Sequence, residues 1–462
     1  MLGSLPAAQN ELFYDFCLED YVPQDNLLRQ IDQFLDFSDR RKHLSSFYSH
    51  TGRPSIDPEL MIRMLIVSYC YGIRSERRLC EEVNLNLAYR WFCRLGLEGG
   101  LLDHSTFSKA RHGRFRDSDT FRRVFEQVVD RCMVEGLVGG EGFATDASLI
   151  KADANWEHSV PGKEIMDHLP QSGASRPIQD YLDTLEQNGP QGNPPKKISL
   201  SDPQSRWSCN RKGAVDFFYS NNYLIDIEHN IIMDTRATPA NRSNEVESTR
   251  EMISHVESHF GVKPNRLMGD TAYGTAPMLG WLVEEKHIEP HIPVWDKSEG
   301  KEGLFARSDF TWHEQDEYYQ CPAGKRLLNG RRNFKQPRSG ITKANTIIYR
   351  CSTADCKTCH YKQQCCPNTS NRKIARSIHE SSRDVARAIT KTPEYKQSSN
   401  DRKKVEVVFG HMKNILKFER LRLRGLRGAQ DEFLLVALAQ NLRKLAKCCY
   451  QPPPDRELAV FM

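Results

Sequence analysis

The sequence predicts an α/β protein, a mixed sheet flanked by helices, with an all-helical domain before it and a cysteine-rich insertion within it. Three observations support this prediction. Segments with helical apolar spacing and N-cap residues follow one another from Asp57 to Gly136. From Phe143 onward, runs typical of strands alternate with helical runs. Six of the 14 cysteines fall between Cys321 and Cys366, and a chain of 462 residues exceeds one ordinary core.

The domain at 1–138 is expected to consist of short helices joined by brief turns. Their candidate starts are Asp57 followed by Pro58, Ser75, Ser105, and Ser118 or Asp119, and the last helix ends at Gly136. Arginine and lysine side chains lie on the polar faces, which suits a helix-turn-helix-like DNA-binding module. A plain helical scaffold is the alternative.

The core is predicted at 139–296 and 377–450, with a flexible Pro/Gly/Gln-rich insertion at 157–205. Strands are expected at 143–152, 215–228, 230–240, 266–270 and 288–294, and helices at 244–260, 275–288, 394–416 and 431–449. An RNase H-like core has this order of elements: three strands, a helix, a strand, a helix and a strand. The segment 297–376 is expected to be a basic, zinc-ribbon-like insertion.

Positive charge is concentrated in two runs, although the net charge is only +5. Eight Lys/Arg and no acid lie from Lys325 to Arg350, and nine against two acids lie from Arg402 to Arg427. Such runs suit a polyanion, although solvated basic faces are equally common. No stretch is long and apolar enough for a membrane helix, and the start lacks a signal pattern, so we expect a cytoplasmic protein.

Three carboxylates suggest metal-dependent chemistry. Asp146 and Asp270 lie within or at the end of predicted strands, and Glu406 lies on a predicted helix. Carboxylates that converge on one point can hold two Mg²⁺ ions, which activate a nucleophile and relieve charge on a leaving oxygen. A lone aspartate at a strand end is more often a turn or cap residue, and Asp153 competes with Asp146.

The surroundings of these carboxylates add weight. Arg402, Glu406 and Lys413 are spaced R-(3)-E-(6)-K, which places two cations near the carboxylate on one helix face. Asp270 stands in the run GDTAYG.

These motifs resemble bacterial insertion-sequence transposases of the DDE class, whose Glu lies in a Tyr-(2)-Arg-(3)-Glu-(6)-Lys signature. The runs LLDHSTFSKAR, ISLSDPQSRW and KFERLRLRGL resemble other parts of one branch of that family. The resemblance implies the catalytic triad Asp146, Asp270 and Glu406, and DNA contacts from Arg402, Lys413 and Tyr273. Ser399 stands where the signature has its tyrosine, which puts the role of that aromatic in doubt.

The resemblance further implies Mg²⁺ or Mn²⁺ as cofactor, and terminal inverted repeats and target DNA as double-stranded partners. In this family water attacks at the element's ends, and the freed 3′-hydroxyl then attacks target DNA. A homodimer on DNA and association with the bacterial nucleoid are the family expectations. The rival readings are a DNA-binding protein that has lost cleavage and another RNase H-like nuclease.

The cysteine cluster predicts a structural Zn²⁺ site. Cys356 and Cys359 have zinc-ribbon spacing, and Cys321 and Cys365 complete the favoured ligand set. Rival ligands are Cys351, Cys366 and His360. The alternative is a reduced cluster without metal.

Overall fold

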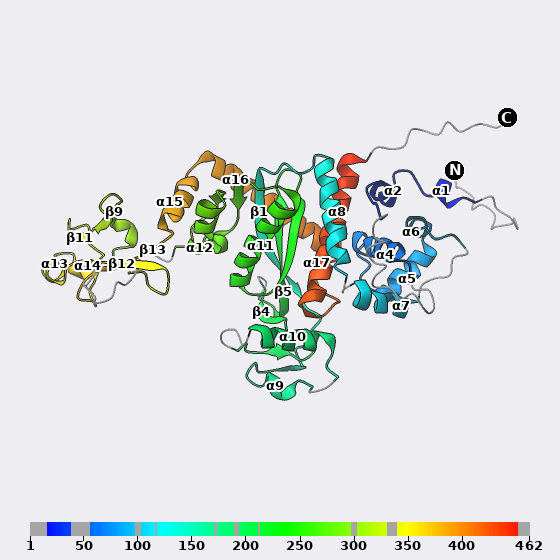
Figure 1. The fold of residues 1–462 in the computed structure, drawn as a ribbon, viewed down its shortest axis with the longest axis horizontal. Helices are drawn as coiled ribbons and strands as arrows, with labels where there is room; N and C mark the ends of the chain where they lie inside the picture. Colours follow the sequence, from blue (N-terminus) through cyan, green and yellow to red (C-terminus); the bar gives the residue numbers. More distant parts are fainter. Residues whose placement is uncertain are drawn as a thin grey trace, which may run out of the picture. The chain divides into compact units, whose positions relative to one another are not determined.

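The computed structural model describes residues 16–37, 56–97, 103–115, 118–170, 173–188, 194–210, 213–296, 303–329 and 340–450. The chain divides into two compact units, which are described separately. The first unit comprises Met1–Gly140, Thr145–Lys263 and Lys404–Met462, and the second comprises Glu141–Ala144 and Pro264–Lys403. Figure 1 shows the order of the elements along the chain. None of the helices in these ranges is both long and apolar enough to cross a lipid bilayer.

The N-terminal part of the first unit is helical, as predicted. Its elements are α1 (Leu18–Tyr21), α2 (Leu27–Asp32), α4 (Pro58–Cys70), α5 (Glu76–Leu85), α6 (Leu87–Phe92), α7 (His104–Ala110), the π-helical turn η1 (Arg111–Phe115) and α8 (Thr120–Val134). The Asp57 carboxylate caps α4 by accepting from the Glu59 N–H at 2.8 Å, with Pro58 in the first turn. The single helix expected from Ser75 is divided at Asn86, whose side chain caps α6.

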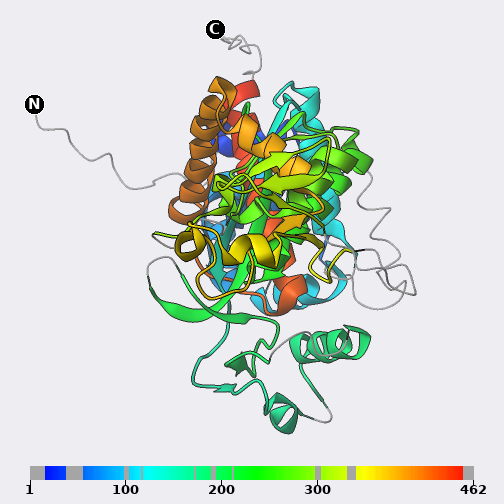
Figure 2. The same cartoon turned by 90° about the vertical axis from the view of Figure 1, so that its left-hand side faces the viewer.

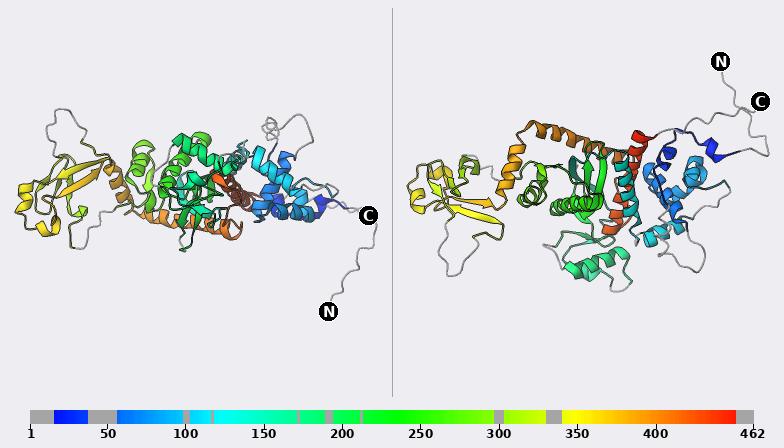
Figure 3. Two further views of the ribbon diagram at one scale, coloured as in Figure 1. Left: turned by 90° about the horizontal axis from the view of Figure 1, so that it is seen from below. Right: turned by 45° about the horizontal axis from the view of Figure 1, so that its top comes forward.

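The sheet of the first unit has the order β4–β5–β1, with β6 paired to β5. These strands are β1 (Gly142–Lys151), β4 (Arg206–Cys209), β5 (Val215–Asp226) and β6 (Ile231–Pro239). Helix α11 (Arg242–Phe260) packs on β5 and β6, and α17 (Gly425–Cys449) packs on β6, α8 and α4. Figures 1 and 3 show α17 running beside α8, so the last helix of the described residues holds the N-terminal helices to the core.

The second unit contains a parallel sheet. Residues Gly142–Ala144 at the start of β1 pair with β7 (Arg266–Met268), and β7 pairs with β8 (Glu289–His291). The connection after β7 holds the 3₁₀ turn η2 (Thr271–Tyr273), α12 (Ala276–Gly280) and the π-helical turn η3 (Trp281–Glu285). Helix α15 (Glu380–Ile389) packs on α12 and β8. Helix α16 (Pro393–Asn414) begins in this unit and ends in the first.

The order β1, β5, β6, α11, β7, α12, β8 confirms the predicted fold class, a mixed α/β sheet with an N-terminal helical region. The strands predicted at 266–270 and 288–294 are each reduced to three residues, Arg266–Met268 and Glu289–His291. The strand after α11 ends at Met268, two residues before Asp270, because the chain turns there into η2.

The segment expected to be flexible carries defined structure instead. It contains β2 (Ser159–Val160), α9 (Ile165–His168), α10 (Arg176–Asn188) and β3 (Ile198–Ser199), which Figure 2 shows below the sheet. Its buried side chains Ile165, Leu169, Ile178 and Ile198 form a small core of their own. These apolar residues are interspersed among many Pro, Gly and Gln residues, so the composition of the segment does not indicate a core.

The cysteine-rich segment is also folded around apolar side chains. Its elements are the 3₁₀ turn η4 (Arg307–Asp309), β9 (Thr311–His313), β10 (Tyr318–Gln320), β11 (Arg326–Leu327), β12 (Thr346–Arg350), α13 (Thr353–Lys357), α14 (Lys362–Cys365) and β13 (Lys373–Ser377). Strands β9–β11 form one antiparallel sheet, and β12 and β13 form another. Phe310, Tyr319, Leu327 and Tyr349 pack with Cys351, Cys356 and Cys366 in one cluster. The insertion therefore has a small apolar core of its own, in which three of its cysteines take part.

Candidate active site

Asp146 lies within β1 in the first unit. Asp146 is only 9% exposed, and its Oδ1 accepts a hydrogen bond from the Ala147 N–H at 2.8 Å. Residues Phe143 and Ala144 before it are fully buried. The strand thus holds this carboxylate on a rigid support, as a metal ligand requires.

Asp270 lies in the second unit, directly after β7. Its Oδ1 accepts from the Ala272 N–H at 2.8 Å, so the carboxylate caps the turn η2. In the parallel pair of β1 and β7, Ala144 is opposite Met268. Asp146 and Asp270 each come two residues after these paired positions. Each aspartate is therefore separated by the same number of residues from the last paired residue of its strand.

Tyr273 closes the same turn and is 2% exposed. A side chain this buried does not present a surface to DNA, so its position does not support the DNA contact that the family resemblance implies. Gly274 follows it, and a Cβ there would lie 2.0 Å from the Pro293 carbonyl oxygen. Tyr273 and Gly274 thus serve the packing around the Asp270 turn.

Glu406 lies on α16, which is continuous from Pro393 to Asn414. The buried face of its C-terminal half carries Val405, Val408 and Met412, and the Met412 sulfur accepts from the Tyr223 hydroxyl of β5 at 3.3 Å. Glu406 is exposed. Its helix is therefore anchored on the sheet of the first unit, and its carboxylate is accessible to solvent.

Arg402 and Lys413 lie on the same helix, one turn before and two turns after Glu406. Both are half-buried. The structure therefore places the R-(3)-E-(6)-K motif within one uninterrupted helix, as predicted.

The loop after α16 is an exposed basic segment. It alternates buried apolar residues with exposed cations, which are Lys417, Arg420, Arg422 and Arg424, and the exposed Arg427 follows in the first turn of α17. The Leu421 N–H donates to the Lys151 carbonyl at 2.8 Å, so this basic loop runs along the end of β1. The strand that carries Asp146 thus ends beside a row of arginines.

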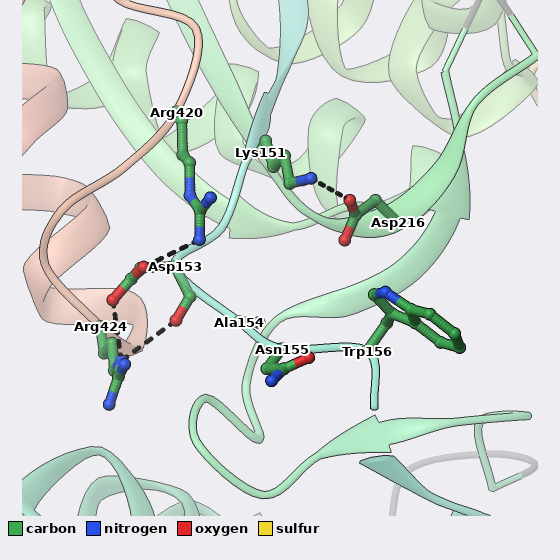
Figure 4. Close-up of a pocket in the computed structure, with 8 residues that line it drawn as sticks. All are labelled: Lys151, Asp153, Ala154, Asn155, Trp156, Asp216, Arg420 and Arg424. Carbon is green, nitrogen blue, oxygen red and sulfur yellow. Dashed lines mark hydrogen bonds and ion pairs between the residues drawn. The ribbon is translucent and has the colours of Figure 1, made fainter. Parts of the chain in front are cut away.

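A cavity of about 280 Å³ lies at this end of β1 (Figure 4). Arg420 and Arg424 each donate to the Asp153 carboxylate at 3.0 Å, and Lys151 forms an ion pair with Asp216. Trp156, 57% exposed, lines the opposite side. Asp153, the alternative to Asp146 as the first carboxylate of the triad, therefore pairs with two arginines. The sequence pattern did not single out Lys151 or this pairing.

The other basic run, from Lys325 to Arg350, is only partly described. Lys325, Arg326, Lys343 and Arg350 lie within the described ranges, and the cations at 331–338 lie outside them. Lys325 lies 3.6 Å from Asp355.

The cysteines of the insertion surround one small cavity of about 20 Å³, room for a single water-sized occupant. Its lining includes all six, namely Cys321, Cys351, Cys356, Cys359, Cys365 and Cys366. The Cys321 sulfur accepts from the Lys325 N–H at 3.3 Å, and Lys362 Nζ lies 3.4 Å from the Cys366 sulfur. Burial raises the pKa of Cys351 and Cys365 to about 12, so both stay protonated thiols without a metal.

Within the described ranges, one group of three side chains brings its ligand atoms within 4.8 Å of one another, and it consists of Glu126, His255 and His259. The cysteine sulfurs do not form such a group in this structure. The sequence offered one signal for the histidines, the spacing His-(3)-His on a helix, which was not singled out.

Comparison with protein families gives two matches. Residues 16–113 match a transposase domain (DUF772), and residues 320–446 match a transposase DDE domain. Comparison with curated proteins and with solved structures gave no match. Glu406 lies in the second matched range, and Asp146 and Asp270 lie between the two ranges.

Both matched families are domains of transposases, enzymes that move segments of DNA. The two matches support an insertion-sequence transposase of the DDE class. Such enzymes act on DNA and depend on a divalent metal ion, typically Mg²⁺.

Proposed function

We propose that this transposase binds the terminal inverted repeats of an insertion sequence, cuts its ends and joins them to target DNA. Asp146, Asp270 and Glu406 would hold two Mg²⁺ or Mn²⁺ ions, which supply an activated oxygen nucleophile and stabilise the leaving oxygen. Hard carboxylate oxygens are the ligands that these ions prefer.

The observation that carries this proposal is the register of β1 and β7. Asp146 lies within β1, and Asp270 comes shortly after β7, which pairs in parallel with the start of β1. Two aspartates carried by such strands would supply the pair of carboxylates that a divalent-ion site needs. Glu406 is exposed on a helix anchored to the first unit's sheet, which suits a third ligand.

The chain's own cations would hold the DNA. Arg402 and Lys413 flank Glu406 along α16, and the exposed arginines of the basic loop follow the end of β1. Contacts of this kind neutralise phosphates and position the duplex without reading its sequence. The N-terminal helices are the candidate module for reading the inverted repeats. A homodimer that bridges two element ends, at the bacterial nucleoid, completes the proposal.

The proposal is tested by end cleavage of a repeat-bearing duplex in Mg²⁺. We expect Asp146→Asn, Asp270→Asn and Glu406→Gln to lower the cleavage rate by about 10²–10⁴-fold, because several kcal/mol of charge stabilisation are lost. Asp153→Asn is the matched control and should cut like the wild type, since Asp153 is bound to arginines. Full cutting by any triad variant would exclude that residue. An inactive Asp153→Asn beside an active Asp146→Asn would reassign the first carboxylate.

A metal exchange tests ligation more directly. Asp270→Cys replaces a hard oxygen by a soft thiolate, which Mg²⁺ accepts poorly and Mn²⁺ accepts better. We expect this variant to be inactive in Mg²⁺ and partly restored in Mn²⁺. Equal activity ratios for the two ions in the variant and the wild type would contradict a ligand role for Asp270. This readout also separates the proposal from a protein that binds DNA without cleaving it.

The cysteine-rich insertion is proposed to hold one structural Zn²⁺. Cys321, Cys356, Cys359 and Cys365 remain the favoured ligands, because Cys356 and Cys359 have zinc-ribbon spacing and all four line the same small cavity. The backbone N–H donated to the Cys321 sulfur would stabilise a thiolate there. Cys351 and Cys366 line the same cavity and remain the rival ligands.

A further inference from the structure

A second cluster of metal-binding side chains lies in the first unit, outside the triad and the cysteines. His255 and His259 are one turn apart on α11, and Glu126 lies on α8. His255 Nε2 lies 3.2 Å from Glu126 Oε1, and His259 Nε2 lies 3.7 Å from Glu126 Oε2. The two imidazole rings are nearly parallel, with centroids 5.4 Å apart.

These separations match the edges of a zinc coordination shell. Zn²⁺ binds histidine nitrogens and carboxylate oxygens at about 2.0–2.2 Å, so neighbouring ligand atoms in a tetrahedron are roughly 3.3–3.5 Å apart. The two measured separations bracket this range. Two histidines four residues apart on one helix face are a common way of presenting such ligands.

Asp234 gives His255 a defined orientation. Its Oδ2 lies 3.1 Å from His255 Nδ1, and the aspartate is fully buried at the start of β6, where it pairs with Arg122. A carboxylate beside a histidine favours the tautomer with the proton on Nδ1, which would leave the Nε2 lone pair for a metal. That lone pair then points at the Glu126 carboxylate. A lone pair and a carboxylate that face each other repel, and either a metal ion between them or a proton on Nε2 removes this repulsion.

We propose that Glu126, His255 and His259 bind one Zn²⁺ ion, which connects α8 to α11. The side chains are 12%, 23% and 43% exposed, so the site opens to solvent and a water molecule can complete the shell. Helix α8 is the last helix before β1, and α11 packs on β5 and β6. The ion would therefore join the N-terminal helical part of the first unit to its sheet.

The competing occupant of this position is a proton. Without a metal, Asp234 and Glu126 raise the pKa of His255 to about 9, and an imidazolium satisfies both carboxylates. Zinc binding would displace that proton, because a ligating histidine is neutral. The zinc-bound state requires His259 as a ligand. The protonated state does not, because an imidazolium at His255 needs no second histidine.

The experiment measures zinc bound to the full chain after chelator treatment, reloading with Zn²⁺ and desalting. His259→Ala is the main variant, because its exposed side chain is dispensable for packing. His104→Ala, also 43% exposed, is the matched control outside the cluster. Both are made in the wild type and in a Cys356→Ser/Cys359→Ser background, which removes the zinc proposed at the cysteines. We expect His259→Ala to contain one zinc equivalent less than His104→Ala in each background.

Two further readouts keep the result interpretable. Glu126→Gln should lose the same equivalent, and circular dichroism would show whether each variant is folded. Co²⁺ loaded into the Cys356→Ser/Cys359→Ser background should give visible ligand-field bands from the histidine site, and His259→Ala should lose those bands. Equal zinc in folded His259→Ala and His104→Ala would overturn the site and leave the imidazolium as the occupant. None of these measurements depends on cleavage activity, so they are independent of the proposed triad.

Discussion

Arg420 donates a hydrogen bond from its guanidinium to the Asp153 carboxylate at 3.0 Å, and this pair joins the basic loop to the end of β1. The Arg420 and Asp153 side chains are 50% and 29% exposed. An ion pair this open contributes at most about 1 kcal/mol to folding. Its arginine is therefore free to exchange its partner for a phosphate at little cost in stability.

We expect Arg420→Ala and Arg424→Ala each to weaken DNA binding to any sequence. Each removed phosphate contact should lower the slope of log affinity against log salt by about 1. Electrophoretic mobility shifts at several salt concentrations measure this slope. Arg131→Ala, an arginine of similar exposure on α8, is the control and should leave the slope unchanged. Unchanged slopes for both loop variants would exclude the basic loop from the DNA interface.

Glu432→Gln should destabilise the first unit strongly. The Glu432 carboxylate is fully buried in α17, where it pairs with Arg74 and accepts from the Tyr69 hydroxyl at 3.1 Å. Removing one partner of a buried ion pair costs about 3–5 kcal/mol, because the other charge stays buried. Urea unfolding measures the change. Glu82→Gln is the control at an exposed i,i+4 pair and should cost less than about 1 kcal/mol; a comparable loss in both variants would contradict the argument.

Asp202 should make stability depend on pH. Burial raises the pKa of this carboxyl from 3.8 to about 6, although the Tyr219 hydroxyl donates to it at 2.6 Å. The folded state therefore holds the proton more tightly than the unfolded state. The stabilising effect of that proton is complete below the unfolded pKa and is lost as the pH rises through about 6.

Asp202→Asn, which cannot ionise, should remove this dependence. The difference between the two pKa values corresponds to at most about 3 kcal/mol. We expect the variant to gain stability relative to the wild type as the pH rises from about 4 to about 7. Urea unfolding across that range tests this, with the exposed Asp167→Asn as control. A constant difference between variant and wild type at all pH values would show that Asp202 does not titrate in this way.

Zinc removal should affect the cysteine-rich segment without unfolding it completely. The apolar cluster around Tyr319 and Tyr349 remains when a metal is chelated, so we expect loosened structure with retained strands. Hydrogen exchange of residues 303–376 before and after chelation measures the change. Cys359→Ser should lose one zinc equivalent and Cys209→Ser, an exposed cysteine elsewhere, should lose none. Full zinc content in Cys359→Ser would exclude that ligand.

The sequence predicts the elements of the core well, because their signals are local. The Asp57-Pro58 cap, the turn at Asn230 with its positive φ, and the strand of Asp146 all appear where the residues indicate. Long-range relations are not encoded locally. The ion pairs of Asp153 with Arg420 and of Glu432 with Arg74 join residues hundreds of positions apart, and no spacing rule identifies them.

The candidate site divides in the same way. The motif around Glu406 could be predicted from the sequence, because its residues lie on one helix. The relation between Asp146 and Asp270 could not, because it depends on how β1 pairs with β7. The burial of Tyr273 and the small core around Ile178 escaped sequence reasoning, because composition does not show which side a residue faces.

The position of α17 has a consequence for biosynthesis. Tyr69 and Glu432 are 363 residues apart in the chain, so the N-terminal helices leave the ribosome long before their partner helix is made. Until then, the apolar face of α4 and the Arg74 side chain lack the contacts that α17 provides. Structures that depend on such distant contacts fold slowly, and they expose hydrophobic surface until folding is complete. A prematurely terminated chain would therefore be prone to aggregation or degradation rather than a free DNA-binding fragment, and only complete copies of the enzyme would reach DNA.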